Sequence, residues 1–402
     1  MHYVSLPLAL LELGRPLPVD VWAPDGRLLM RRGTLVMSEQ HKDMLRAHHA
    51  GMTPIDAQAW QKSFDRKIRR LMRDGADMDQ IASARMPTEI LDADYLSEQT
   101  LRGGWLDLQA VLQGLLYQAE GAIAALQRLQ GLESKALALL QADPDDGLFV
   151  LFQAMADDSY GYSPTHALLC ALVCELSARK LELPEQERRV LFSAALVMNI
   201  GMARIQDSLV HQDSALIEAQ RILIQEHPQK SVAILQSFGV EDEDLLDLVR
   251  WHHEEDDTVG LARNLELRRI LHTADAYVAK MAARKTRPAL SPLRAAKSTA
   301  IDAEGHSQRI GSAMAAAIGF YPPGTYVQLA NGETAVSLAR GRRADRPQVL
   351  AIIRPDGMPL GKYVHRDTSE AVFAITAPVS AGSIKVKVNL EKARKMRAER
   401  WR

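Results

Sequence analysis

The side chains of this sequence that could do chemistry are four histidines and one aspartate in the middle of the chain. His166, His227, His252, His253 and Asp275 carry imidazole and carboxylate groups, which are common ligands of Fe, Mn and Zn. If the fold brings these five residues together, we expect them to hold one transition metal ion. The alternative is that they are polar residues hydrogen-bonded within a bundle of helices.

Two cysteines follow the first of these histidines at helical spacing. Cys170 and Cys174 lie near the same helical face as His166, which is a pattern that a soft metal site could use. Free cysteine is usually a small buried apolar residue, and we favour that interpretation. A disulfide between adjacent turns of one helix has poor geometry, so the pair indicates a reducing, cytoplasmic compartment.

The charge of the chain argues against a polyanionic partner. Its 49 Lys and Arg residues against 50 Asp and Glu give a net charge of −1 over 402 residues, so no overall field attracts nucleic acid or an anionic membrane. No apolar run approaches the roughly 20 residues that span a bilayer, and the first residues lack the basic start of a signal peptide. We therefore expect a cytoplasmic protein without membrane insertion.

The elements that must position these side chains are mainly helices. Residues 1–57 combine short strands, an Asp25-Gly26 turn and a helix opened by Ser38, which indicates a small α+β module. Residues 58–91 form a charged helical linker whose basic residues are either a solvated face or a docking surface. From 92 to 320, apolar residues recur at helical intervals, with a break near Asp143-Pro144.

A β-rich extension follows the helices. Residues 325–329 and 334–338 flank Asn331-Gly332, which is the turn typical of a β-hairpin, and residues 348–353 with Asp356-Gly357 predict further strand. The extension covers 321–402 and ends in a basic tail that we expect to be a frayed helix, with electrostatic docking as the alternative. The predicted fold class is mainly α: a helical bundle between a small N-terminal α+β module and a small C-terminal β-rich extension.

The order of these residues resembles the HD-GYP family, bacterial phosphodiesterases of the signalling dinucleotide cyclic di-GMP within the HD phosphohydrolase superfamily. The resemblance covers about 145–320 and implies that the helical bundle is of the HD type. It implies that the five residues above are the family's metal ligands, with His227 before Pro228 and His253 before Glu254 as the family has them. It also implies that Arg287 belongs to a phosphate-binding segment, of which only Arg287-Pro288 remains.

The chain departs from the family where the family places its central His-Asp-x-Gly-Lys motif. The segment here is Met198-Asn199-Ile200-Gly201-Met202, so a thioether and a neutral amide replace the imidazole and the bridging carboxylate. Met202 removes the lysine that could neutralise phosphate charge. The Gly-Tyr-Pro signature is also missing from a shortened loop at 256–261. A two-metal phosphodiesterase needs the bridging anion, so the resemblance implies a degenerate active site.

Three functions follow from this comparison. We favour a non-catalytic signalling protein of cyclic di-GMP pathways, which acts on a protein partner or as a homodimer. The alternatives are a receptor that binds cyclic di-GMP without hydrolysis, and a metal-dependent phosphodiesterase with an altered metal site. The sequence contains no phosphate-binding glycine loop, no Gly-x-Ser-x-Gly nucleophile and no Cys-His zinc pattern that would suggest another activity. It does not identify the partner or the pathway.

Overall fold

The computed structural model describes residues 3–74, 80, 84–90, 104–157, 160–254, 256–283, 285, 289–296, 298, 306–386 and 388–400. The chain divides into two compact units, Met1–Leu132 and Glu133–Arg402. The domain boundaries expected at 57, 91 and 320 remain predictions. Among the described residues, no helix combines the length and the apolar character that crossing a bilayer requires.

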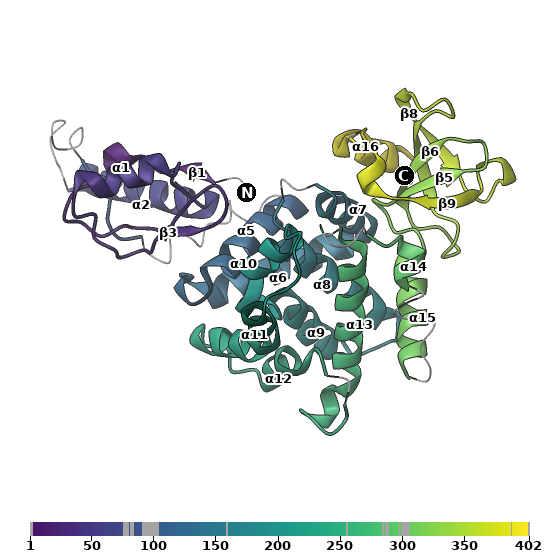
Figure 1. The fold of residues 1–402 in the computed structure, drawn as a ribbon, viewed down its shortest axis with the longest axis horizontal. Helices are drawn as coiled ribbons and strands as arrows, with labels where there is room; N and C mark the ends of the chain where they lie inside the picture. Colours follow the sequence, from purple (N-terminus) through teal and green to yellow (C-terminus); the bar gives the residue numbers. More distant parts are fainter. Residues whose placement is uncertain are drawn as a thin grey trace. The chain divides into compact units, whose positions relative to one another are not determined.

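The first unit begins with a small antiparallel sheet, drawn in purple in Figure 1. Its strands, in the order β1-β4-β2-β3, are β1 (Val4–Ser5), β4 (Gly51–Met52), β2 (Val21–Trp22) and β3 (Leu28–Met30). Gly26 turns the chain between β2 and β3 with a φ of 85°, a conformation that favours glycine. Helix α1 (Glu39–Ala47) starts after Ser38, whose hydroxyl accepts a hydrogen bond from the His41 amide.

Helix α2 (Pro54–Arg73) carries the basic residues expected of a linker, yet one of its faces is buried. Trp60 and Ser63 are 2% and 1% exposed. The Trp60 indole N–H donates to the Pro87 carbonyl oxygen at 2.8 Å, and the Ser63 hydroxyl donates to that of Glu89 at 3.0 Å. The segment after the helix therefore returns to pack on it, and α2 is part of the first unit. Helix α5 (Trp105–Gln118) follows, and α6 (Ala125–Ala142) spans the boundary between the units.

The second unit is built around a central buried helix. Its helices are α7 (Pro144–Met155), α8 (Tyr162–Lys180), α9 (Glu185–Val197), α10 (Ala203–Val210), α11 (Glu218–Ser237), α12 (Glu243–Trp251), α13 (Leu265–Met281), α14 (Pro292–Ala296) and α15 (His306–Ile318). Every residue of α8 from Tyr162 to Ala178 is buried, because α7, α9, α10, α13 and α15 all pack against it. Small and apolar side chains on all sides of α8 suit this position.

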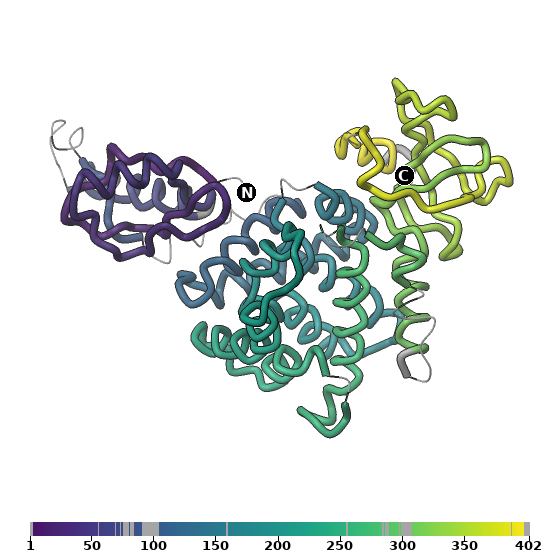
Figure 2. The backbone as a smooth tube through the Cα atoms, viewed as in Figure 1, coloured from purple at the N-terminus to yellow at the C-terminus, as the bar shows by residue number. Residues whose placement is uncertain are grey.

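After α15 the chain enters a five-stranded antiparallel sheet, in light green and yellow in Figure 2. In the order β8-β7-β6-β5-β9, its strands are β8 (Pro359–Asp367), β7 (Gln348–Ile353), β6 (Thr334–Ala339), β5 (Tyr326–Leu329) and β9 (Ile375–Val379). The hairpin around Asn331-Gly332 pairs Tyr326 with Val336. The predicted fold class, mainly α with a small α+β module before the bundle and a β-rich extension after it, is confirmed.

The basic tail is a docked helix, where the sequence suggested a frayed one. Helix α16 (Leu390–Arg400) buries Ala393 in a core that it shares with the sheet and with Phe149 of α7. Arg394 donates two hydrogen bonds to the Asp146 carboxylate, at 2.7 and 2.9 Å. Arg397 bridges Asp143 at 2.7 Å and Asp146 at 3.0 Å. The partner of the tail is thus the acidic first turn of α7.

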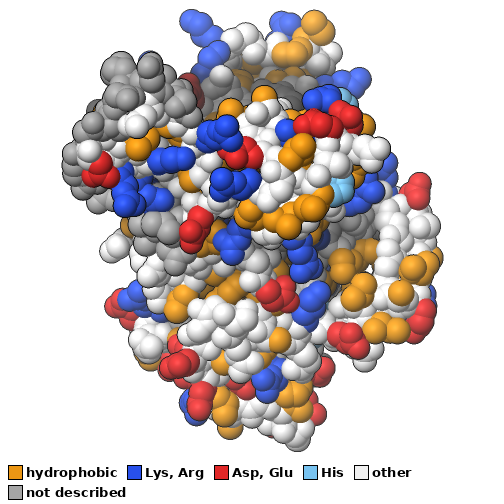
Figure 3. Space-filling view, turned by 90° about the vertical axis from the view of Figure 1, so that its left-hand side faces the viewer, with side chains coloured by type: hydrophobic (Ala, Val, Ile, Leu, Met, Phe, Trp, Pro, Cys, Tyr) orange, Lys and Arg blue, Asp and Glu red, His pale blue; other side chains and the backbone are white. Residues whose placement is uncertain are grey.

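The surface carries charges of both signs. Lys and Arg side chains occur next to Asp and Glu over the face in Figure 3, which agrees with the net charge of −1. Several ion pairs are local contacts between neighbouring exposed residues, such as Arg343 with Asp345 and Arg221 with Glu218. Contacts of this kind contribute little to stability.

Candidate metal centre

Helices α8 and α13 bring the first predicted histidine to the predicted aspartate. His166 is 1% exposed, and its Nε2 atom lies 2.7 Å from Oδ1 of Asp275. The other ring nitrogen lies 3.3 Å from the Tyr162 hydroxyl, one helical turn earlier on α8. The histidine ring is thus held from both sides, and its Nε2 atom is directed at a carboxylate.

The carboxylate of Asp275 is ionised. Burial by itself would raise the pKa of Asp275, but the hydrogen bond and the attraction of His166 lower that pKa below its usual range, with smaller contributions from His252 and His253. A carboxylate that stays negative within the bundle can act as a ligand for a cation. Because 18% of its side chain is exposed, Asp275 connects this group to solvent.

A cysteine belongs to the same group. Cys170 lies one turn after His166 on α8, and its sulfur is 3.4 Å from the His166 Nε2 atom. The ligand atoms of His166, Cys170 and Asp275 all lie within 4.8 Å of one another. Cys174, one further turn along, is equally buried but belongs to neither metal-competent group found among the described residues. Burial raises the pKa of both thiols, which keeps them protonated without a metal.

The three remaining histidines form a second group. His227 lies in α11, and His252 and His253 directly follow α12. The Nε2 atoms of His227 and His252 are 3.2 Å apart, and the rings of His252 and His253 are 4.0 Å apart between centroids. His227 and His252 are buried, whereas His253 is exposed. The ligand atoms of this group also lie within 4.8 Å of one another.

The protonation of this group suits metal binding. Burial lowers the pKa of His227 to about 4, and it also lowers the pKa values of His252 and His253. The imidazoles are therefore neutral near pH 7, and neutral imidazole is the form that binds metals. Two neighbouring imidazolium ions would also repel each other at this distance.

Backbone carbonyls fix the orientation of the two buried rings. Nδ1 of His227 contacts the Ile224 carbonyl oxygen, and Nδ1 of His252 lies 2.8 Å from the Val249 carbonyl oxygen. A carbonyl accepts, so each Nδ1 carries the proton and each Nε2 presents a lone pair. Two lone pairs 3.2 Å apart repel unless a cation lies between or beside them. The donor set and its orientation therefore fit a transition metal such as Fe, Mn or Zn.

The segment 198–202 keeps its close approach to this group. Gly201 packs so tightly on α11 that a Cβ atom would lie 2.7 Å from the His227 carbonyl oxygen. Ser231 holds the segment by donating to the Met198 carbonyl oxygen at 2.8 Å and accepting from the Gly201 amide at 3.0 Å. Met198 is fully buried and Asn199 is 4% exposed. The segment is thus fixed against α11, and the buried side chains at 198 and 199 are neutral.

The uncharged side chain of Asn199 affects whether the site could hold two metal ions. Its side-chain oxygen is buried and has no hydrogen-bond partner among the described residues. An amide oxygen can accept a bond from a donor or a cation, but it brings no negative charge to separate two dications. The residues present therefore fit a single ion better than a bridged pair. Met202 is partly exposed and contributes no charge.

Two arginines differ from what the sequence analysis expected. Arg287, expected to bind ligand, lies outside the described residues. Arg268 of α13 is fully buried, and its three guanidinium nitrogens have no hydrogen-bond partner among the described residues. It lies beneath the shortened loop, where a Cβ on Gly260 would lie 2.8 Å from Arg268 Nη1 and 2.7 Å from Asp247 Oδ1. The sequence contains no signal for this burial, because Arg268 stands next to a second arginine in an ordinary helical pattern.

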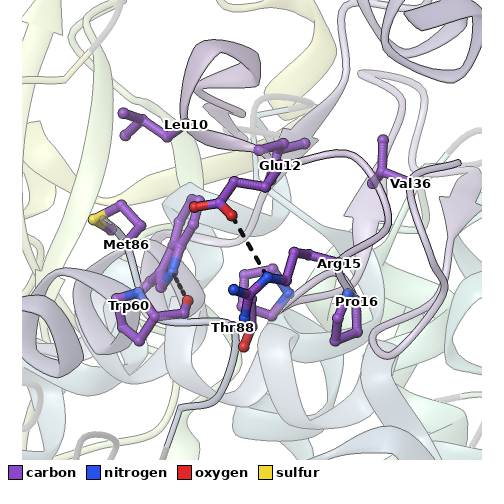
Figure 4. Close-up of a pocket in the computed structure, with 11 residues that line it drawn as sticks. Leu10, Glu12, Arg15, Pro16, Val36, Trp60, Met86 and Thr88 are labelled. Atoms are coloured by element: carbon purple, nitrogen blue, oxygen red, sulfur yellow. Dashed lines mark hydrogen bonds and ion pairs between the residues drawn. The ribbon is translucent and has the colours of Figure 1, made fainter. Parts of the chain in front are cut away.

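The cavities found in the first unit lie apart from this chemistry. One holds only about 10 Å³, room for a single water, between Trp60 and the Glu12–Arg15 ion pair (Figure 4). The other is an open cleft of about 740 Å³, and Pro18, Arg32 and Glu89 are among the residues that line it. Neither contains one of the metal-competent groups found among the described residues.

Comparison with known proteins finds similarity over the helical bundle. Residues 150–307, which include all five predicted ligands, match the family model described as HD domain. Over 212 residues, the chain is 28% identical to the cyclic di-GMP phosphodiesterase PA4108 of Pseudomonas aeruginosa, covering 51% of this chain and 50% of that protein. The chain thus spans about half the length of that relative. A solved structure of Bd1817, an HDG"Y"P protein from Bdellovibrio bacteriovorus, aligns with a TM-score of 0.39 and 15% identity, covering 77% of this chain and 99% of the other.

Proposed function

We propose that this chain carries an HD domain of the HD-GYP type within the HD phosphohydrolases, and that it is a signalling protein that does not hydrolyse cyclic di-GMP. The observation that carries the proposal is the neutral, buried Asn199 in the segment that packs on α11. A phosphodiesterase of two metals needs a bridging anion there. Met198 and Met202 remove two more charged or metal-binding groups from the same turn.

The role that remains is contact with another protein, either a separate partner or a second copy of the chain. Large apolar side chains are exposed where α11 begins: Ile217 at 62%, Ile222 at 45%, Leu223 at 38% and Leu216 at 37%. Apolar side chains grouped on a surface are typical of protein contacts. The balanced charge of the chain supports a specific contact over general attraction to polyanions.

A second candidate is a cyclic di-GMP receptor. The retained His227–His252–His253 group and the relationship to a cyclic di-GMP phosphodiesterase favour it. The shortened loop at 256–261 and the incomplete segment at Arg287 weigh against it. Calorimetric titration of the full chain with cyclic di-GMP separates the candidates, because a receptor gives saturable heat without a linear product.

The proposal is tested by attempting to restore the motif. Purified chain supplied with Mn²⁺ or Fe²⁺ should give no linear dinucleotide or GMP above background by chromatography. The variant Met198→His/Asn199→Asp/Met202→Lys should bind metal more tightly, and Met198→His/Met202→Lys, which keeps the neutral amide, serves as its matched control. Turnover by the unmodified chain that His252→Ala abolishes would overturn the proposal.

The contact surface is tested separately. Ile217→Asp/Ile222→Asp should remove self-association in sedimentation experiments, or remove the partner recovered by cross-linking in the native host. Val372→Asp alters a residue that is 53% exposed outside the bundle and should change neither. If the α11 variant behaves as the unmodified chain does in both experiments, this surface is not the one used.

A further inference from the structure

The group formed by His166, Cys170 and Asp275 is left unassigned by the proposed function. His166 and Cys170 are four residues apart on α8, which places both side chains on one face of the helix. Asp275 reaches the same point from α13. A thiol, an imidazole and an ionised carboxylate thus converge inside the bundle, within 4.8 Å of one another.

Packing does not distinguish Cys170 from Cys174. Cys174 on the same helix is buried to the same extent, so filling a small apolar space explains both cysteines equally well. Only Cys170 has its sulfur 3.4 Å from an imidazole nitrogen and close to a carboxylate. The chain therefore provides its own comparison between a cysteine facing ligand-type atoms and one outside the group.

The distances agree with a shared metal ion. Zinc bonds of about 2.3 Å to sulfur and about 2.0 Å to nitrogen, at a tetrahedral angle, separate the two ligand atoms by about 3.5 Å. The sulfur and nitrogen here are 3.4 Å apart. The 2.7 Å between His166 and Asp275 is a hydrogen-bond length, so the two atoms would move apart slightly as a metal replaces the proton between them.

The charges agree as well. Asp275 supplies one negative charge, and a thiolate at Cys170 would supply a second, which together neutralise a divalent cation. A second anion is what the amide at position 199 cannot provide. Thiolate ligands favour Zn²⁺ over Mn²⁺ or Mg²⁺, which prefer oxygen.

We propose that Cys170 is a thiolate ligand of a single divalent metal ion, held together with His166 and Asp275 and selective for zinc-like ions. Binding releases the thiol proton to solvent. His166 changes tautomer: the proton on Nε2, shared with Asp275, is released to solvent and Nδ1 takes one up from solvent, facing the Tyr162 oxygen at 3.3 Å, so the ring stays neutral. No electron is transferred. The site does not depend on whether the chain hydrolyses cyclic di-GMP.

Cobalt provides the direct readout, because a thiolate bound to Co²⁺ gives a charge-transfer band in the near ultraviolet. Metal-free full-length chain titrated with Co²⁺ should develop this band, and the band should saturate at one thiolate-bound ion per chain, whatever the histidine group binds. Cys170→Ser should lose the band and bind Zn²⁺ at least about tenfold more weakly in chelator competition, while Cys174→Ser should keep both within about twofold. Circular dichroism confirms that each variant is folded.

Two outcomes would overturn the proposal: a folded unmodified chain without the band, or a band that Cys174→Ser removes and Cys170→Ser leaves. If Cys170→Ser does not fold, X-ray absorption of the zinc-loaded unmodified chain decides, since a sulfur neighbour near 2.3 Å must be present. Cyclic di-GMP turnover would contradict the proposed function and leave this cobalt result unaffected.

Discussion

At position 201 only glycine fits, because an added Cβ atom would lie 2.7 Å from the His227 carbonyl oxygen and 2.9 Å from the Ser231 amide nitrogen. Both of these atoms belong to the backbone of α11, so no side chain can turn away to make room. The absence of a side chain at position 201 therefore allows the segment 198–202 to pack directly on the backbone of α11.

We predict that Gly201→Ala lowers the free energy of unfolding of the second unit by about 1–3 kcal/mol, the usual cost of overpacking. It should also weaken metal binding by shifting His227. Urea unfolding and zinc competition measure the two effects. Gly361→Ala is the matched control, because no atom lies within 4 Å of a Cβ built there. Equal stability of the two variants would show that α11 can shift to make room for the added methyl group.

Single residues also mark how far the sequence could predict the site. The five residues predicted as ligands from type and order all fall within the two groups of neighbouring ligand-type atoms, and their binding of a metal stays a prediction. The preference for Cys170 over Cys174 does not, since both lie near the helical face of His166 and only the position of α13 distinguishes them. The burial of Arg268 is likewise a tertiary property, because helix periodicity does not show which loop covers an arginine.

Among the elements, β8 is tied by an ion pair to Glu333, the residue that precedes β6. Arg366 donates two hydrogen bonds of 2.8 Å to the Glu333 carboxylate, and its guanidinium also lies 4.6 Å from the Phe373 ring centroid. The side-chain hydrogen bonds from Arg366 lower the pKa of Glu333 below its ordinary value of 4.5. A carboxyl with a lowered folded pKa stabilises the fold above its unfolded pKa, and that contribution is lost as the pH falls through the folded value.

We therefore predict that the sheet loses stability below about pH 4.5. In Glu333→Gln, the free energy of unfolding should depend less on pH in this range. At neutral pH the same change should cost about 1–3 kcal/mol, because it leaves Arg366 without its anion. Urea unfolding at several pH values measures both. Asp345→Asn breaks the exposed pair with Arg343 and should cost less than about 1 kcal/mol at neutral pH.

Helix α16 gives a second prediction at this scale. Asp146→Asn should loosen its attachment by about 1–3 kcal/mol, because Arg394 and Arg397 both bond to this carboxylate. Hydrogen exchange of residues 390–400 should then be faster, and more so at high salt. Glu391→Gln alters an exposed acid of the same helix and should leave exchange unchanged. Unchanged exchange in Asp146→Asn would mean that apolar packing alone holds the helix.

Elements differ in how well local sequence predicts them. The hairpin at Asn331-Gly332 was predictable because the turn residues fix its geometry. Strand β9 was not, since it contains Pro378 and pairs with β5 from nearly fifty positions away in the sequence. The docking of α16 could not be predicted from local sequence either, because its acidic partner lies in α7, far from the basic tail in the sequence.

At the scale of the whole molecule, the balanced charge predicts what the chain does not bind. At about 0.15 M salt, we expect no association with duplex DNA at chain concentrations up to about 100 μM, since nonspecific binding requires clustered positive charge. Fluorescence polarisation measures this. At low salt the basic residues of α2 should give weak binding that disappears as salt is added. Tight binding at physiological salt would contradict the prediction.

The contact between α16 and α7 joins residues that are 248 positions apart. During synthesis, Asp146 leaves the ribosome long before Arg394 exists, at rates of about 5–20 residues per second. Until then, the part of the core around Phe149 that Ala393 completes stays open, and the first turn of α7 keeps its negative charge unpaired. A nascent or truncated chain that stops before 390 therefore presents an apolar and acidic surface that chaperones and proteases can recognise, and the finished chain hides it.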